Sequence, residues 1–104
     1  IYMMENSVYS ILSPEGFASI LWKDVSRSKE AALAMKITAD DLKNFNIIDD
    51  IIKEPQGGAH NNPIEASNNI KAFITKDLEE LINQDINYLL ENRYNKFREI
   101  GNFY

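Results

Sequence analysis

Two apolar stripes at helical spacing run through residues 63–104 and constrain the fold more than any other feature. In each stripe an apolar residue recurs every three or four positions, which is typical of a helix with one buried face. The stripes consist of Ile70, Phe73, Ile74, Leu78, Leu81 and Ile82, and then of Ile86, Leu89, Leu90, Tyr94 and Phe97. Asp85 can cap the second helix and Gly101 is a stop signal. Two such helices carry more apolar surface than short strands can cover. We therefore expect them to pack on another part of a longer protein or on another subunit.

β-branched and aromatic residues favour strands in three segments of the first half of the chain. We expect strands at 1–5, 7–12 and 47–53, with a turn at Asn6-Ser7 and with 7–12 buried on part of both faces. A helical crossover of about thirty residues between the second and third strands would form a βαβ unit. The chain opens at Ile1 without an initiator methionine and inside a strand, which favours a C-terminal piece of a longer protein.

Three helices are predicted in that crossover. Ser13 can cap the first, Pro14 suits its first turn, and Glu15 lies favourably at the positive end of the helix dipole. Gly16 costs roughly 1 kcal/mol there relative to Ala, which indicates a close approach of backbone or ligand, or a tight packing contact. The second helix is expected at 28–36. The third begins with a capping box at Thr38-Ala39-Asp40-Asp41, runs to about Phe45, and ends at a left-handed Asn46.

Length and composition exclude several classes of protein. The chain has 104 residues, enough for one domain with a radius of gyration of about 13 Å if it is compact. Its longest apolar run is five residues, too short for a transmembrane span or a secretion signal. It has no cysteine, so disulfides, cysteine zinc sites and thiol nucleophiles are excluded. The net charge of −5 argues against a nucleic-acid partner.

No complete catalytic constellation is visible from residue spacing. His60, the only histidine, follows Gly57-Gly58, where backbone N–H groups could meet an anion or the glycines could simply shape a surface loop. One histidine cannot form a metal site alone. The serines lack the context of a serine hydrolase. The acidic pairs Asp40-Asp41, Asp49-Asp50 and Glu79-Glu80 point apart and are expected to be solvated.

A basic patch lies near the end of the chain, at Arg93, Lys96 and Arg98. Cations at the end of a helix interact favourably with its dipole, which is a sufficient structural reason for them. A contact with a phosphorylated substrate such as coenzyme A is the sharper alternative. Trp22 and Phe17 are expected in the core or in a subunit interface.

Segments along the whole chain match the sequence pattern of one known family. They are 4–16, 18–24, 33–42, 47–49, 51–52, 54–55, 57–60, 93–94, 96–98 and 101. The block Ser13-Pro14-Glu15-Gly16 followed by Ala18-Ser19-Ile20-Leu21-Trp22 is the most specific of them. In these segments the chain resembles the C-terminal portion of the bacterial acetyl-CoA carboxylase carboxyltransferase α subunit. Phe17 stands where that family usually has a small residue or Cys, and Asn46 where it usually has Gly.

The resemblance implies an α/β fold that is mostly helical. It would be a C-terminal fragment of a crotonase-like β-β-α superhelix, with a few short strands and two long C-terminal helices. Residues 1–62 would then form part of the carboxyltransferase core, and residues 63–104 a helical extension for packing or subunit contact. Other crotonase-like acyl-CoA enzymes, and a non-catalytic helical assembly module, are the alternatives.

The resemblance also implies a reaction and partners. The family moves a carboxyl group from carboxybiotin, delivered by the biotin carboxyl carrier protein, to acetyl-CoA, giving malonyl-CoA for fatty acid biosynthesis. The α subunit pairs with a β subunit in an α2β2 heterotetramer, in the cytoplasm. We expect no bound cofactor or metal, and no nucleic acid or membrane partner.

The resemblance assigns no catalytic residue to this chain. The oxyanion glycines of the family lie upstream of these residues, so the chain alone should be inactive. The residues that could shape the site or bind substrate are Ser13, Glu15, Gly16, Gly57, Gly58 and His60.

Overall fold

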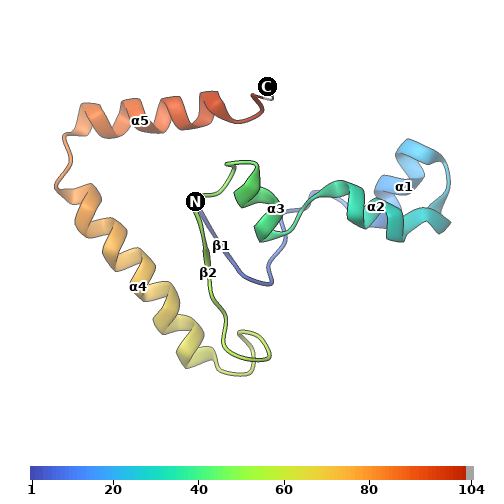
Figure 1. Cartoon of the computed structure of the whole chain (residues 1–104), viewed down its shortest axis with the longest axis horizontal. Helices are drawn as coiled ribbons and strands as arrows, with labels where there is room; N and C mark the ends of the chain where they lie inside the picture. The colour runs from blue at the N-terminus through green and yellow to red at the C-terminus, as the bar shows by residue number, and fades with distance from the viewer. Residues whose placement is uncertain (103–104) are drawn as a thin grey trace.

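Two short parallel strands lie at the centre of the molecule, and the helices extend from them in two directions (Figure 1). The computed structural model describes residues 1–102. Strands β1 (Tyr2–Met4) and β2 (Asp50–Ile52) pair with Tyr2 opposite Asp50 and Met4 opposite Ile52. A helical crossover does join two parallel strands, but the first of them is 2–4, so the expected unit of 7–12 with 47–53 is wrong.

The predicted strand at 7–12 is wrong. Within residues 1–102 this segment pairs only through an antiparallel bridge between Val8 and Thr38 and a hydrogen bond of 2.9 Å from the Tyr9 N–H to the Ile37 carbonyl, and the chain bends at Ile11 and Leu12. Ile11 is 97% exposed. A strand requires a neighbour for its backbone groups and a surface to cover its side chains, and the rest of this chain supplies little of either.

The helices of the crossover form largely where the sequence places them. Helix α1 (Pro14–Trp22) is capped by Ser13, whose Oγ accepts a hydrogen bond from the Gly16 N–H at 3.1 Å. A 3₁₀ turn, η1 (Val25–Arg27), leads into α2 (Ser28–Met35). Helices α1 and α2 pack on each other and lie away from the strands.

Helix α3 (Ala39–Asn44) has the predicted capping box, with Thr38 and Asp41 each accepting a hydrogen bond from the other's backbone N–H. Asn46 closes it at a φ of 56°, also as predicted. The strand expected over 47–53 is shortened because the N–H groups of Ile47 and Ile48 both donate to the Leu42 carbonyl of α3. Those amides are not available to a neighbouring strand.

The two predicted terminal helices are confirmed as α4 (Pro63–Ile82) and α5 (Ile86–Glu99). Asp85 caps α5 as expected, while the cap of α4, Asn62, was not predicted. Helix α4 lies beside the sheet, where the Phe73 ring meets Tyr2 edge-on with centroids 5.1 Å apart. Its Asn69 amide also donates to the Lys53 carbonyl at 3.0 Å.

The core is small, and its main cluster beside the strands consists of Met3, Ala39, Leu42 and Ile48. Ile52 and Ala66 are also buried, and Ala18 and Ala31 are buried separately, where α1 and α2 pack on each other. The radius of gyration is 17.3 Å and the extents are 52 × 38 × 19 Å, so the expected compact shape is wrong. Helices α4 and α5 diverge and leave their apolar stripes largely exposed (Figure 1). In the described part of the chain no helix is long and apolar enough to cross a membrane.

Candidate functional site

The carboxyl ends of the two strands lead into a turn and a loop that are joined by reciprocal hydrogen bonds. The Glu54 carboxylate accepts from the Asn6 N–H at 2.7 Å, and the Glu5 carboxylate accepts from the Glu54 N–H at 3.1 Å. Lys53 Nζ also binds Glu5, at 2.9 Å. These two donors lower the pKa of the Glu5 carboxyl, the Lys53 hydrogen bond most. α/β proteins commonly place ligand contacts at this edge of a sheet.

The loop after β2 has a conformation that requires both of its glycines. Gly57 and Gly58 have φ values of +84° and +104°, a region that other residues rarely adopt. A Cβ on Gly58 would lie 3.0 Å from the His60 ring, and one on Gly57 would overlap the Asn61 side chain. A hydrogen bond across the loop also fixes its shape, because the Ala59 N–H donates to the Glu54 carboxylate at 3.2 Å. The sheet edge therefore carries a backbone loop of fixed shape.

His60 lies on the exposed side of this loop. Among residues 1–102 no side chain forms a hydrogen bond or an ion pair with it. A general base needs a partner to orient it and a position close to the reacting proton. Within the described residues the loop can present backbone groups and a shaped surface, and it supplies no orienting partner for proton transfer.

The second group of predicted site residues lies at the start of α1. The Ser13 hydroxyl is occupied in capping the helix, and Glu15 is exposed in the first turn. A Cβ on Gly16 would meet Leu12 Cδ1 at 3.4 Å, an ordinary contact, so nothing among residues 1–102 requires a glycine there. Beside them is an apolar hollow of about 490 Å³, lined by Tyr9, Ser10, Ile11, Leu12, Phe17, Met35 and Ile37.

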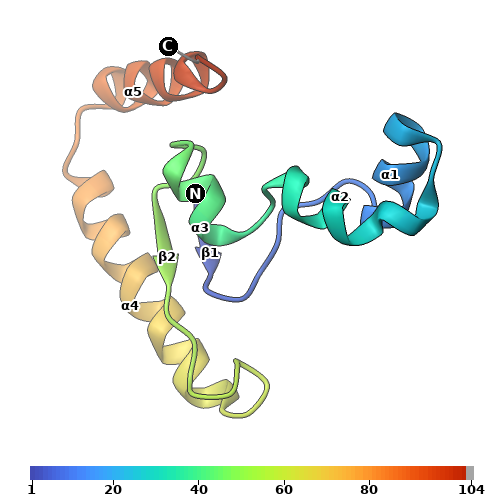
Figure 2. The same cartoon turned by 45° about the vertical axis from the view of Figure 1, so that its right-hand side comes forward.

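The structure does not bring these two groups together. Figure 2 shows α1 at one end of the molecule and the loop that precedes α4 at another, and the view in Figure 1 agrees. Ser13, Glu15 and Gly16 thus belong to one surface, while Gly57, Gly58 and His60 belong to a second. Within the described residues no group of three or more His, Asp or Glu side chains is placed to hold a metal ion.

The basic patch near the end of the chain is divided among three partners. Lys96 forms an ion pair with Asp49, Arg93 lies over the Phe97 ring at 5.0 Å, and Arg98 lies over the Tyr94 ring at 5.9 Å. It is therefore not a single cluster directed at one phosphate.

The ion pairs also correct the expectation that Asp49 and Asp50 are merely solvated. Asp50 is paired with Lys43 at 2.5 Å. Partial burial raises the pKa of the Asp49 carboxyl, but hydrogen bonding, above all from Lys96, outweighs it and lowers that pKa.

Two contacts that fix the terminal helices were missed from the sequence. The Tyr2 hydroxyl donates to the Asp77 carboxylate, which raises the pKa of Tyr2 to about 12. The Lys96–Asp49 pair ties α5 to the start of β2. Their partners are 75 and 47 positions apart, so no local spacing could have indicated them.

Comparisons with known proteins give one consistent result. The acetyl-CoA carboxylase carboxyltransferase α subunit of Clostridium beijerinckii is 62% identical over 104 residues, all of this chain and 38% of that protein. The α subunit of Clostridium perfringens is 63% identical over 102 residues, 98% of this chain and 38% of that protein. The α subunit of Staphylococcus haemolyticus is 53% identical over 103 residues, 99% of this chain and 33% of that protein.

The chain thus spans little more than a third of the length of these relatives. A family described as acetyl co-enzyme A carboxylase carboxyltransferase-like matches residues 1–101. These matches run along the same extent as the sequence resemblance. The chain therefore belongs to the acetyl-CoA carboxylase carboxyltransferase family.

Proposed function

We propose that this chain forms part of the carboxyltransferase component of an acetyl-CoA carboxylase. That component transfers the carboxyl group of carboxybiotin to the methyl carbon of acetyl-CoA and gives malonyl-CoA. The observation that carries the proposal is the family match over residues 1–101, supported by 62% identity along the whole chain to an α subunit.

Within that reaction the chain contributes scaffold and walls rather than reacting groups. Carboxyl transfer develops negative charge on the enolate of the thioester and on the ureido oxygen of biotin, and preorganised N–H donors stabilise such charges. The resemblance places the family's oxyanion glycines upstream of these residues. The fixed Gly57-Gly58 loop and the start of α1 at Ser13 are the surfaces of this chain best suited to shape such a site.

The proposed partners follow from the same family membership. A β subunit would complete the α2β2 assembly, and the biotin carboxyl carrier protein would deliver carboxybiotin, so that no cofactor need bind this chain itself. We propose that residues 1–62 belong to a crotonase-like core and residues 63–104 to a helical extension, working in the cytoplasm. The exposed stripes of α4 and α5 support an extension that packs on other surfaces.

A chimera tests the proposal. The matching 38% of the Clostridium beijerinckii α subunit is replaced by this chain and assembled with the β subunit. With carboxybiotin and acetyl-CoA supplied, we expect malonyl-CoA formation within about tenfold of the parent enzyme, whereas the isolated chain should form none, because loss of a single oxyanion donor typically costs about 10² to 10³ in rate.

Two controls separate the alternatives. A His60→Ala chimera should keep its turnover if His60 is not a general acid or base; a loss of about a hundredfold with normal assembly would make it catalytic. A chimera that assembles and folds but forms no malonyl-CoA would contradict the proposal. Hydration of an enoyl-CoA by the same chimera would favour the other crotonase-like enzymes.

A further inference from the structure

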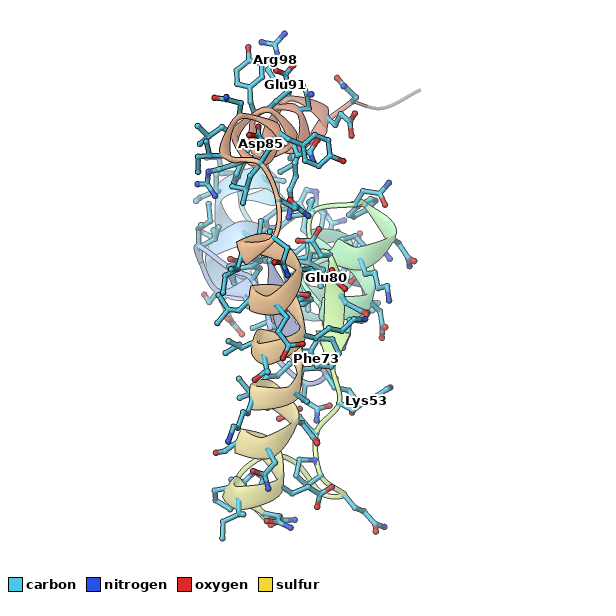
Figure 3. The ribbon with its side chains drawn as sticks, turned by 90° about the vertical axis from the view of Figure 1, so that its left-hand side faces the viewer. Lys53, Phe73, Glu80, Asp85, Glu91 and Arg98 are labelled. Atoms are coloured by element: carbon cyan, nitrogen blue, oxygen red, sulfur yellow. The ribbon has the colours of Figure 1, made fainter. Side chains whose placement is uncertain are left out.

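A single carboxylate joins the loop of residues 55–61, here called the glycine loop, to the turn that follows β1. Glu54 Oε2 accepts a hydrogen bond from the Asn6 N–H at 2.7 Å, and Glu54 Oε1 accepts one from the Ala59 N–H at 3.2 Å. Figure 3 shows the preceding residue, Lys53, where the chain leaves β2 and continues toward the first turn of α4. Glu54 thus lies at the entrance of the glycine loop, and both of its carboxylate oxygens are occupied.

The other hydrogen bonds of the glycine loop fix its internal shape. The Gly58 N–H donates to the Pro55 carbonyl at 2.9 Å, and the Asn61 N–H donates to the Gly58 carbonyl at 3.1 Å. Each of these bonds joins residues three positions apart, so neither sets the direction of the loop relative to the strands. Burial of Pro55 holds the start of the loop. Within residues 1–102, only the Glu54 carboxylate ties its second half to the turn after β1.

The glycine loop also has backbone donors to present. The N–H groups of Gly57 and His60 donate to no group within residues 1–102. Such donors favour a reaction most when they are held in place before it begins. Their direction depends on how the loop is held against the strands, and therefore on Glu54.

We propose that Glu54 is a positioning residue of the carboxyltransferase, and that its carboxylate fixes the direction in which the glycine loop faces a substrate. The substrate group that suits free N–H donors is a carbonyl-type oxygen. It belongs either to the thioester of acetyl-CoA or to the carboxylated ureido ring of biotin. This inference rests on the proposed function, because it assigns the glycine loop to the wall of that site.

The two hydrogen bonds require a carboxylate of this length. An ionised carboxylate only accepts, and it offers two oxygens, whereas the amide of Gln offers one oxygen and turns a donor toward the second N–H. Hydrogen bonds to an ionised acceptor are also stronger than those between neutral groups. Glu54 forms no ion pair within residues 1–102, so its charge serves these two backbone amides.

The test uses the chimera described above, assembled with the β subunit, and its variants Glu54→Gln and Glu54→Ala. KM is measured separately for acetyl-CoA and for carboxybiotin, together with kcat. We expect kcat/KM to fall by about tenfold or more, mainly through a higher KM for the substrate that the loop meets, because a misplacement of about 1 Å can cost up to 10²-fold. The effect should be larger for Ala, which removes both hydrogen bonds, than for Gln.

The split between KM and kcat separates positioning from a merely structural role. A variant that only folds poorly has fewer active sites, which lowers the apparent kcat and leaves both KM values unchanged. The identity of the KM that rises shows whether the loop meets acetyl-CoA or carboxybiotin.

Hydrogen exchange of the same assemblies shows directly whether the loop is released. Amides of residues 57–61 and of Asn6 should exchange faster in both Glu54 variants, because their ties to the carboxylate are weakened or lost. Glu79→Gln is the matched control. It removes a carboxylate of the same size from an exposed position of α4, and should change neither the KM values nor exchange in the loop.

The outcomes are distinct. An active parent chimera whose Glu54 variants keep both KM values within twofold, or keep the parent's exchange in residues 57–61, would overturn the inference and leave the proposed function standing. A parent chimera that forms no malonyl-CoA would contradict the proposed function instead, and exchange in residues 57–61 would still decide whether Glu54 holds the loop.

Discussion

Three glycines that the sequence marks as candidates for the site place different demands on the backbone. Gly57 and Gly58 adopt left-handed conformations, whereas Gly16 is an ordinary helical residue with room for a methyl group at 3.4 Å from Leu12. Gly58→Ala should therefore lower the free energy of unfolding by roughly 1 kcal/mol or more, through backbone strain. Gly16→Ala should leave it unchanged or raise it by up to about 1 kcal/mol. Urea unfolding of each variant measures both effects.

His60→Ala is the control for the same loop, and as an exposed substitution it should stay within about 0.5 kcal/mol of the wild type. If Gly58→Ala and Gly16→Ala had equal effects on stability, the conformations assigned to these glycines would be wrong.

The Glu5 carboxylate makes stability depend on pH. Its pKa is lowered from 4.5 by the hydrogen bond from Lys53 and by the Glu54 N–H. A group whose pKa is lower in the folded state stabilises the fold above its unfolded pKa, and this contribution disappears as the pH falls through the folded value. The free energy of unfolding should thus decline below about pH 4.5, and less steeply in Glu5→Gln. Urea unfolding at a series of pH values tests this, and equal slopes in the two proteins would count against it.

At the scale of elements, the terminal helices differ in how they are held. Helix α4 contacts the sheet through Phe73, Asp77 and Asn69, whereas α5 is tied through Lys96. Local stability follows the number of buried and bonded groups. At concentrations where the chain is monomeric, amide hydrogens of α5 should exchange faster than those in the middle of α4.

Lys96→Met should speed exchange further in α5 alone, because it removes the pair with Asp49. The matched control is Lys71→Met. Lys71 is an exposed residue of α4 that has no ion pair within the described residues, so its replacement should change hydrogen exchange in neither helix. Slower exchange in α5 than in α4, measured by mass spectrometry, would contradict this account.

For the whole molecule, the size of the core sets the stability. Among residues 1–102, four of the buried apolar side chains belong to alanines (Ala18, Ala31, Ala39 and Ala66), which have little side chain to remove from water. We therefore expect the isolated chain to melt below about 45 °C, the lower end of the usual range for domains of mesophiles. The midpoint should rise with protein concentration, because association stabilises the folded form by mass action. A monodisperse monomer with a high melting temperature by calorimetry would refute this.

Local features were predictable from the sequence because each depends on residues a few positions apart. Ser13, Thr38 and Asp85 cap their helices as expected, and Asn46 takes the left-handed position. The glycine loop at 57–58 was likewise recognisable, since a strand followed by Pro and two glycines indicates a tight turn. The role of its residues in a site stays a prediction.

The sequence by itself determined the five α-helices, the caps at Ser13, Thr38 and Asp85, and the family, whereas only the tertiary structure decided which elements meet. Segment 7–12 has the composition of a strand, but strand pairing depends on partners distant in sequence, and within residues 1–102 it finds only the bridge to Thr38 and one hydrogen bond to Ile37. The pairs Tyr2–Asp77 and Lys96–Asp49, and the separation of the α1 surface from the glycine loop, are also long-range facts. Helical and capping energies are local, but the contacts that place helices in space join residues far apart in the chain, and no periodicity encodes them.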